Sequence, residues 1–479
     1  MKQTGDKYFD SEEFQKLLKE YETSVNAGEP VFMDVEELVD IADYYQYTNR
    51  KDEADRVISL ASSLSPDDAS YLTYRIHESL FQGNTEKAWE YLDQMLEKDE
   101  PDYIYNRTEI LLSEERFDEA NEYLEEIFQE MPADERQDFL VDIANIFVEY
   151  NRPGDAMRWM KEAKQEDTTD FKELKARTLF GLGKYKDSQK LFNELLDTNP
   201  FSTSYWNALA SAQFMNEDFS EAIKSSEYAI AIDPEDSDSL MAKANALYRL
   251  GNYEEAIKFY EKYFELVPND EFPLLYIGTS LINLQRTEEA IETLKKALEI
   301  TPEDSPNLCD IYQELAFAYS ENKETDKALE VIEKTDALDC DHVQMLLIKG
   351  HILLAAERSH EAKEVFRKVL RITNTPKQTL LRVIVSYYDN RYLEGAYNLL
   401  KNYLTTYEEM ENGKNTEGYA YMALCCYEMK KLNEFLTYLK EACKRNPHEC
   451  RIALSHLFPE EVKPEDYYQY IKEKLNIEE

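Results

Sequence analysis

Hydrophobic residues recur at helical spacing along most of the chain. The first run predicts one helix with an apolar face formed by Phe14, Leu17, Leu18, Tyr21 and Val25. Asp10 and Glu13 have the spacing of a capping box at its start, and Gly28 is expected to end it. Similar runs follow, separated by short polar turns, so the pattern predicts helix throughout and almost no strand.

Proline divides the central part of this pattern into equal lengths. Between Thr169 and Asp304, four prolines recur every 34 residues, at Pro200, Pro234, Pro268 and Pro302. Each follows one amphipathic run and precedes another. Because proline lacks an amide hydrogen and clashes with the preceding turn, it ends a helix. Each 34-residue unit is therefore expected to hold two helices.

A small residue near the start of each second helix keeps the same period over a longer stretch. These residues are Ala54, Ala88, Ala120, Ala156, Ser188, Ala222, Ala256, Ala290, Ala328, Ala362 and Ala396. Their spacing is mostly 34, and the departures coincide with short insertions around 133–136 and 305–308. Small residues let the two helices of a hairpin approach closely. With a further unit at 416–449, the pattern predicts about twelve hairpins over residues 35–449.

The units resemble tetratricopeptide repeats, whose pattern is W-x2-L-G-x2-Y, then A-x3-F, then P over 34 residues. Residues 271–304 match it at Leu274, Ile277, Gly278, Leu281, Ala290, Leu294, Ala297 and Pro302. Residues 203–236 match it at Trp206, Leu209, Ala210, Ala222, Ala229 and Pro234. The chain is thus similar to bacterial-type proteins built from many such repeats.

This resemblance implies an all-α fold, a right-handed α-solenoid superhelix of hairpins with a capping helix at each end. The expected parts are an N-terminal capping helix in 1–34, acidic repeats 1–8 in 35–304, near-neutral, cysteine-containing repeats 9–12 in 305–449, and C-terminal capping helices in 450–479. The last helix is expected to begin at Pro464 and to carry Tyr467, Tyr468, Ile471 and Leu475.

Charge is distributed unevenly. The formal net charge is -44, and residues 1–340 hold 34 basic against 77 acidic side chains, whereas residues 341–479 hold 20 against 21. Such a surface repels phosphate backbones and anionic membranes, so nucleic acid and membrane are excluded as partners. Two interpretations remain open: the acidity maintains solubility, or it serves a basic partner.

All six cysteines lie after residue 308, without the spacing of a disulfide scaffold, so reduced thiols in a cytoplasmic protein are expected. The N-terminus has no apolar signal segment, and no apolar run is long enough to span a membrane. The strongest metal candidate combines Cys425, Cys426, Cys443, His448 and Cys450. It lacks C-x2-C spacing, and adjacent cysteines on a helix point about 100° apart, so buried structural thiols are the preferred interpretation.

No catalytic motif is present: the sequence has no G-x-G-x-x-G, G-x4-G-K-[ST], H-E-x-x-H or G-x-S-x-G. The chain is therefore expected to have no cofactor and no enzymatic activity. Its work is expected to be that of a cytoplasmic scaffold or adaptor that binds a protein or peptide.

The resemblance implies that first helices line a concave groove. The candidate partner-binding residues on these helices are Tyr105, Asn106, Asn145, Arg177, Asn207, Asn245, Tyr276 and Arg382. Asparagine and tyrosine can bond an extended peptide backbone, and an ordinary solvated helix face is the open alternative.

One ligand class of the family is excluded. Its clamp for chaperone C-terminal carboxylates needs Lys and Asn, then Asn, then Lys and Arg on three successive first helices. The corresponding positions hold Asn207 and Ser211, Ala242, Phe272 and Tyr276. Basic or neutral segments are favoured as partners instead. A second hypothesis is a regulatory sensor whose superhelix changes shape on binding a small peptide or molecule, with hinges near residues 305 and 411.

Overall fold

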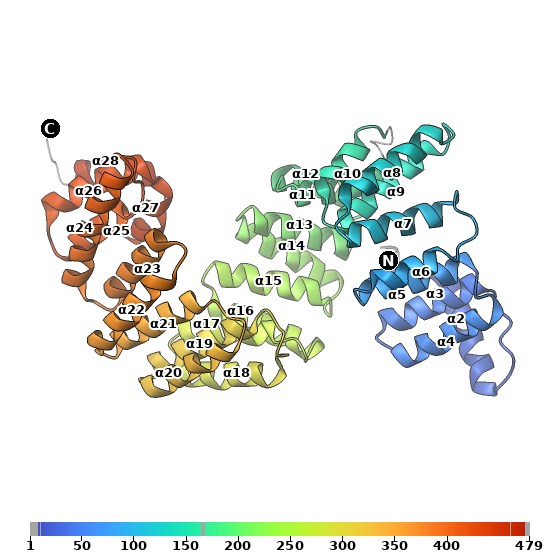
Figure 1. The fold of residues 1–479 in the computed structure, drawn as a ribbon, viewed down its shortest axis with the longest axis horizontal. Coiled ribbons are helices and arrows are strands. Elements are labelled where there is room, and N and C mark those ends of the chain that lie inside the picture. Colours follow the sequence, from blue (N-terminus) through green and yellow to red (C-terminus); the bar gives the residue numbers. More distant parts are fainter. Residues whose placement is uncertain (1–7, 10, 164–167, 460, 475–479) are drawn as a thin grey trace. The chain divides into compact units, whose positions relative to one another are not determined.

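The computed structural model describes residues 8–9, 11–163, 168–459 and 461–474. These residues form α-helices and three short 3-10 helices, and the described part contains no strand, which confirms the all-α prediction. The chain divides into two compact units, Met1–Asp218 and Phe219–Glu479. Within each unit, successive helices pair and the pairs follow one another (Figure 1).

Unit 1 begins with a single helix, which is followed by helix pairs. Its helices are α2 (Glu12–Ala27), α3 (Val35–Tyr47), α4 (Lys51–Leu64), α5 (Ala69–Phe81), α6 (Thr85–Leu92), α7 (Pro101–Ser113), α8 (Phe117–Glu130), α9 (Arg136–Glu149), α10 (Pro153–Met160), α11 (Thr169–Gly181), α12 (Tyr185–Thr198) and α13 (Thr203–Met215).

Unit 2 continues the same pattern and ends in short helices. Its elements are α14 (Phe219–Ile232), α15 (Ser237–Arg249), α16 (Tyr253–Leu266), α17 (Phe272–Asn283), α18 (Thr287–Ile300), α19 (Leu308–Glu321), α20 (Thr325–Lys334), η1 (Thr335–Ala337), α21 (His342–Ala355), α22 (Ser359–Ile372), α23 (Pro376–Asp389), α24 (Leu393–Met410), α25 (Tyr419–Glu428), α26 (Leu432–Arg445), α27 (Pro447–Leu454), η2 (Ser455–Leu457), η3 (Pro464–Asp466) and α28 (Tyr467–Lys474).

From α3 to α26, first helices are odd-numbered and second helices even-numbered, in the order that the sequence predicts, and the eleven pairs that lie within one unit pack together. Every small residue of the periodic series is buried, with an exposed fraction of 1% or less. The four evenly spaced prolines each lie two residues beyond the end of a second helix, from α12 to α18. Small residues thus mark the contact between helices, and proline marks the turn between repeats.

The turn inside each pair contains one residue with a left-handed backbone. These residues are Asn49, Gly83, Glu115, Asn151, Gly183, Glu217, Gly251, Gln285, Lys323, Glu357, Arg391 and Lys430. In this conformation, the amides of the turn residue and of the next residue donate to carbonyl groups at the end of the first helix. For example, the amide of Gln285 donates to Ile282 O and that of Arg286 to Leu281 O, both at 2.9 Å. Non-glycine residues adopt this backbone at a cost, because Cβ crowds the carbonyl oxygen.

We expect Gln285→Gly to stabilise unit 2 by about 0.5–1 kcal/mol, because glycine removes that crowding at φ 60°. The matched control is Gly251→Ala in the preceding hairpin, where φ is 76° and only Tyr253 comes within 4 Å of an added Cβ. That change should lower stability by a similar amount. Urea unfolding followed by circular dichroism measures both variants, and shifts of the same sign would contradict the argument.

Both ends of the repeat array are covered by helices. At the N-terminal end, Ser11 caps α2 by accepting from the amide of Phe14 at 3.1 Å, and Gly28 ends the helix as predicted. The predicted cap Asp10 lies outside the described residues. Val25 does not belong to the buried face, since it is 46% exposed near the end of α2.

At the C-terminal end, the ring of Tyr467 is buried and stacks on Phe458 at 3.8 Å. Tyr470 also contacts the Phe458 ring, with centroids 6.0 Å apart. These contacts close the end of unit 2, whereas Leu475 lies outside the described residues.

The prediction that all six cysteines are reduced is wrong for one pair. Cys309 and Cys340 form a disulfide that links the start of α19 to the segment before α21. The two residues are 31 positions apart in sequence, but a helix hairpin returns the chain to its starting end, which brings their Cα atoms within 5.7 Å. The other four cysteines are buried and form no disulfide.

Candidate functional site

A row of hydrogen-bonded pairs connects successive first helices in unit 1. Tyr105 on α7 donates from its hydroxyl to Asp142 Oδ2 on α9 at 2.8 Å. Arg177 on α11 donates from Nη1 to Asn145 Oδ1 on α9 at 2.9 Å. Three of the predicted contact residues therefore pair with one another or with a carboxylate of the adjacent repeat.

The row extends in both directions beyond these predicted residues. Tyr205 on α13 donates to Glu173 Oε2 on α11 at 2.8 Å, and His77 Nε2 on α5 lies 2.9 Å from Glu109 Oε2 on α7. We call the following residues the unit 1 row: His77, Tyr105, Glu109, Asp142, Asn145, Glu173, Arg177 and Tyr205.

Partial burial changes the ionisation of groups in and beside this row. Desolvation raises the pKa of Asp142, although the Tyr105 hydroxyl opposes it. Desolvation also raises the pKa of Glu149, which neighbours the row on α9. The pKa of Arg177 is lowered by desolvation, and the carboxylates of Glu149 and Glu173 oppose this. The surroundings of the row therefore contain more carboxylates than cationic groups, which makes their potential negative.

Asn106 lies beneath the row rather than in it. The residue is 2% exposed, and its Nδ2 donates to Thr73 Oγ1 at 2.7 Å, which joins α7 to α5. Its Oδ1 is buried and has no partner in the described part of the chain. Asn106 thus positions the two helices, whereas Asn207 is partly exposed on α13.

In unit 2, two more predicted residues belong to an aromatic group. Asn245 on α15 accepts a hydrogen bond from the hydroxyl of Tyr260 on α16 at 2.7 Å. Tyr276 on α17 contacts the rings of Phe272 at 4.5 Å, Tyr248 at 5.1 Å and Tyr260 at 5.8 Å. Tyr248 is not among the residues expected from the sequence, although it occupies the same face of α15 as Asn245, three residues further on.

Arg382 lies at one end of a series of hydrogen-bonded side chains on the following three first helices. Its Nη2 donates to Gln344 Oε1, and Gln344 Nε2 donates to Gln313 Oε1 at 3.0 Å. The chain connects α23, α21 and α19. Amide and guanidinium groups thus replace the carboxylates that dominate the unit 1 row.

Both predicted hinge regions carry specific contacts. Near residue 305, Glu271 Oε1 accepts from the Ser305 hydroxyl at 2.5 Å and from Asn307 Nδ2 at 3.0 Å. Near residue 411, Lys377 Nζ lies 2.6 Å from Glu411 and 3.4 Å from Glu417. These contacts join the residues on either side of each junction, and the sensor mechanism stays a hypothesis.

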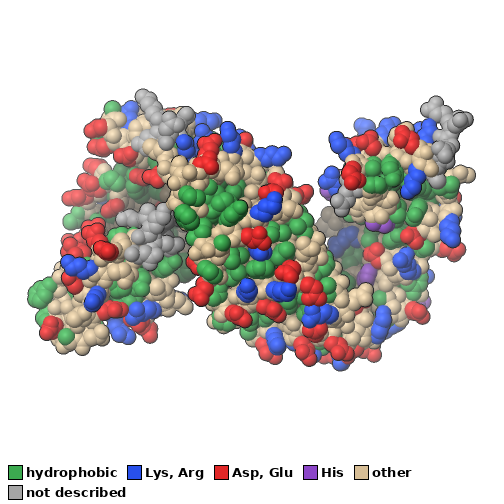
Figure 2. Space-filling view, turned by 180° about the vertical axis from the view of Figure 1, so that it is seen from behind, with side chains coloured by type: hydrophobic (Ala, Val, Ile, Leu, Met, Phe, Trp, Pro, Cys, Tyr) green, Lys and Arg blue, Asp and Glu red, His purple; other side chains and the backbone are tan. Residues whose placement is uncertain are grey.

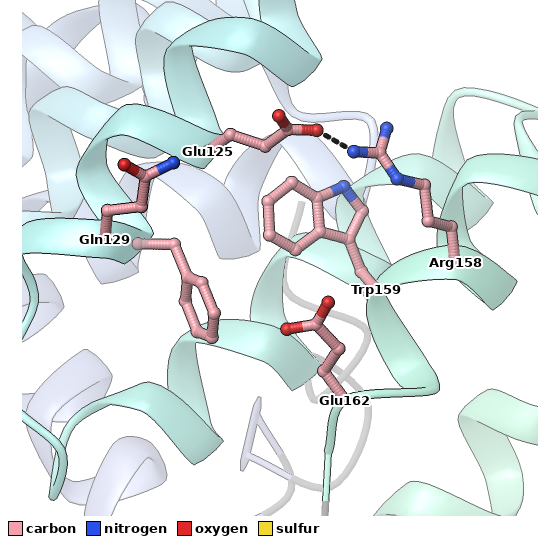
Figure 3. Close-up of a pocket in the computed structure, with 6 residues that line it drawn as sticks. Glu125, Gln129, Arg158, Trp159 and Glu162 are labelled. Atoms are coloured by element: carbon pink, nitrogen blue, oxygen red, sulfur yellow. Dashed lines mark ion pairs between the residues drawn. The ribbon is translucent and has the colours of Figure 1, made fainter.

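A hollow of about 290 Å³ lies between the second helices α8 and α10 (Figure 3). It is lined by Glu125, Phe128, Gln129, Arg158, Trp159 and Glu162. The Trp159 indole donates to Asn121 Oδ1 at 3.1 Å, and Arg158 forms an ion pair with Glu125 at the rim. The lining contains no nucleophile or metal-ligand set, so the hollow is not assigned a chemical role.

The described residues of the cysteine-containing C-terminal repeats include no candidate metal site. No group of three or more His, Cys, Asp or Glu side chains in the described residues could hold a metal ion. Burial raises the pKa of Cys425 to about 12 and that of Cys426 to about 11, which keeps both protonated at neutral pH. The part of the chain that the structure describes also has no helix long and apolar enough to cross a membrane.

Acidic, basic and hydrophobic side chains are interspersed over the face shown in Figure 2. That distribution alone does not single out a docking surface. The candidate contacts therefore come from the side chains that recur on successive first helices.

Three stretches of the chain match family models. Residues 111–177 and 343–376 match tetratricopeptide repeat models, and residues 202–297 match the model described as anaphase-promoting complex, cyclosome, subunit 3. No curated protein matches the chain.

Several solved structures are similar to part of the chain. A tetratricopeptide repeat protein from Parabacteroides merdae ATCC 43184 is 15% identical, covers 53% of this chain and 99% of its own, and has a TM-score of 0.42. MamA from Desulfovibrio magneticus RS-1 is 20% identical over 36% of this chain and 94% of its own, with a TM-score of 0.32. YrrB, described as a TPR protein with an unusual peptide-binding site, is 17% identical over 40% and 95%, with a TM-score of 0.33.

The repeats indicate a general class of function as well as a fold. Tetratricopeptide repeats generally form non-enzymatic scaffolds that bind protein or peptide partners. The helix pairs, their shared period and the stretches that match tetratricopeptide repeat models identify the chain as a multi-repeat tetratricopeptide-repeat protein.

Proposed function

We propose that the chain is a non-enzymatic adaptor that binds a protein or peptide segment along its first helices. The unit 1 row carries this proposal, because it repeats hydrogen-bonding groups on successive first helices. Three of its four pairs join residues 32 positions apart: His77 with Glu109, Asn145 with Arg177, and Glu173 with Tyr205. An extended segment presents its own donors and acceptors at regular steps and can pair with such a row.

Charge favours a basic or neutral segment. Carboxylates outnumber cations in and around the unit 1 row, and the chain as a whole carries a net charge of -44. Nucleic acid would be repelled by this field. The proposed contacts are Tyr105, Asn145, Arg177, Asn207, Asn245, Tyr276 and Arg382, with Asn106 supporting them from beneath.

A cytoplasmic location remains a prediction. The disulfide between Cys309 and Cys340 does not favour it, because disulfides persist mainly in oxidising compartments.

We expect Glu173→Gln to weaken binding of the partner about three- to tenfold at low salt. The glutamine can still accept from Tyr205, so the change removes charge while keeping the pairing with α13. Partners would first be captured with the full chain as bait and identified by mass spectrometry. Affinity for the purified partner would then be measured by fluorescence anisotropy at two salt concentrations.

The matched control is Glu122→Gln on the second helix α8, where the side chain is exposed. Its effect should be less than about twofold, because one distant exposed charge is largely screened. Equal effects of the two substitutions would place the partner on another surface and overturn the assignment to the first helices.

A further inference from the structure

Four aromatic rings gather on the first-helix side of unit 2. We call Tyr248, Tyr260, Phe272 and Tyr276 the Tyr276 cluster; they lie on α15, α16 and α17. The ring of Tyr248 meets that of Tyr276 edge to face, at an interplanar angle of 88°. Tyr260 is fully buried, whereas the other three side chains are partly exposed. The cluster therefore has a buried base and an accessible aromatic surface.

A carboxylate accompanies this surface on the next first helix. Glu314 on α19 is partly exposed, and desolvation raises its pKa, as does the negative charge of Asp310 one turn earlier. The Glu314 carboxylate in turn contributes to raising the pKa of the Tyr248 hydroxyl to about 12. Helices α17 and α19 pack against each other, and Glu314 lies 38 residues after Tyr276, the same interval that separates Ala290 from Ala328. The two side chains therefore occupy corresponding positions on adjacent first helices.

Glu314 forms no ion pair within 4.0 Å among the described residues, and its carboxylate accepts a hydrogen bond from the Gln313 amide at 3.3 Å. Lys243, a basic residue on α15, already pairs with another carboxylate. Its Nζ lies 2.8 Å from Glu227 and 4.1 Å from the centroid of Phe259. The partly desolvated carboxylate of Glu314 is therefore left without a compensating positive charge at hydrogen-bonding distance among the described residues.

We propose that Glu314 and the Tyr276 cluster bind the ammonium or guanidinium group of a lysine or arginine side chain in a basic peptide segment. Such a cation would pair with the carboxylate and lie against the negative faces of the rings, two attractions that strengthen in a partly desolvated setting. An acidic or phosphorylated segment would be repelled. The inference rests on the proposed function and names the chemistry that one part of the groove selects.

The probe is a fluorescein-labelled hexalysine peptide, compared with the same peptide acetylated on every lysine. Fluorescence anisotropy with the full-length protein should give saturable binding of hexalysine and at least about tenfold weaker binding of the acetylated peptide. Glu314→Gln should weaken hexalysine binding about fivefold or more. It should not impair folding, since it removes a charge from a partly desolvated position.

A control substitution separates this site from the general negative field of the protein. Glu299→Gln changes an exposed carboxylate on the second helix α18 and should alter hexalysine affinity less than about twofold. If Glu299→Gln weakens binding as much as Glu314→Gln does, hexalysine is responding only to net charge and the proposal is overturned.

A second pair of variants tests the aromatic part. Tyr276→Phe keeps the ring and should retain affinity within about twofold, whereas Tyr276→Leu keeps apolar bulk but removes the ring and should weaken binding about threefold or more. Equal affinities for the two variants would overturn the role of the ring. If Glu314→Gln has no effect while Glu173→Gln still weakens the captured partner, this inference fails and the proposed function stands.

Discussion

Gly350→Ala is expected to destabilise the α21–α22 hairpin by about 1–3 kcal/mol, because the hairpin has no space for one added methyl group. A Cβ at this position would lie 2.3 Å from Cε1 and 2.5 Å from Cζ of Phe366. The Phe366 ring is buried on α22 and packs against Tyr387, with ring centroids 5.8 Å apart, so it cannot move without disturbing the next repeat. Hydrogen–deuterium exchange of residues 342–372 measures the loss of stability within this hairpin, which a global unfolding curve of a repeat protein can hide.

Two further variants make this result specific to the close contact. Gly154→Ala on α10 adds the same methyl group where nothing lies within 4 Å, and it should be neutral or slightly stabilising. Phe366→Leu shortens the opposing side chain, so combining it with Gly350→Ala should cost less than the sum of the single changes. If the amide hydrogens of the Gly350→Ala variant exchange as slowly as those of the unchanged protein, the two helices do not approach as closely as described.

The sequence could predict the hairpins because their pattern is periodic, but not how closely each pair packs. Ala176 and Ala244 occupy the position of Gly350 in other hairpins, and Ala244 is buried beside Tyr260 as Gly350 is beside Phe366. The approach of α21 to α22 therefore depends on their relative placement rather than on residue type alone. In the same way, glycine signals only some of the left-handed turn residues, because the others, such as Gln285, adopt that backbone despite its cost.

Helical register predicted a shared face for the candidate residues, but it could not reveal the pairings between them. Arg177 and Asn145 were selected separately, and only the stacking of α9 and α11 shows that they bond to each other. Asn106 lies one residue beyond Tyr105, which turns it about 100° around the helix and into the α5–α7 interface.

The residues that sequence reasoning missed are mostly carboxylates and their tyrosine partners. Acidic residues are so abundant that Glu173 or Glu314 carries no signal alone. A usable signal is the recurrence of a bonding pair at the same step: Glu173 with Tyr205 and Asn145 with Arg177 are both separated by 32 residues. For Cys309 and Cys340, a separation of 31 residues is the corresponding sign that a hairpin brings its two ends together.

Loss of the Cys309–Cys340 disulfide is expected to lower the stability of the α19–α20 region by about 3–4 kcal/mol, because the bond closes a loop of about 30 residues and restricts the unfolded chain. Thiol titration of the denatured, unreduced protein should find four thiols, rising to six after reduction. Urea unfolding should then show that reduction destabilises the native protein but leaves the stability of a Cys309→Ser, Cys340→Ser variant unchanged. The double variant controls for effects of the reductant on the remaining cysteines, which are buried and have no disulfide to lose. Six thiols before reduction would contradict the disulfide and restore the reduced state expected from the sequence.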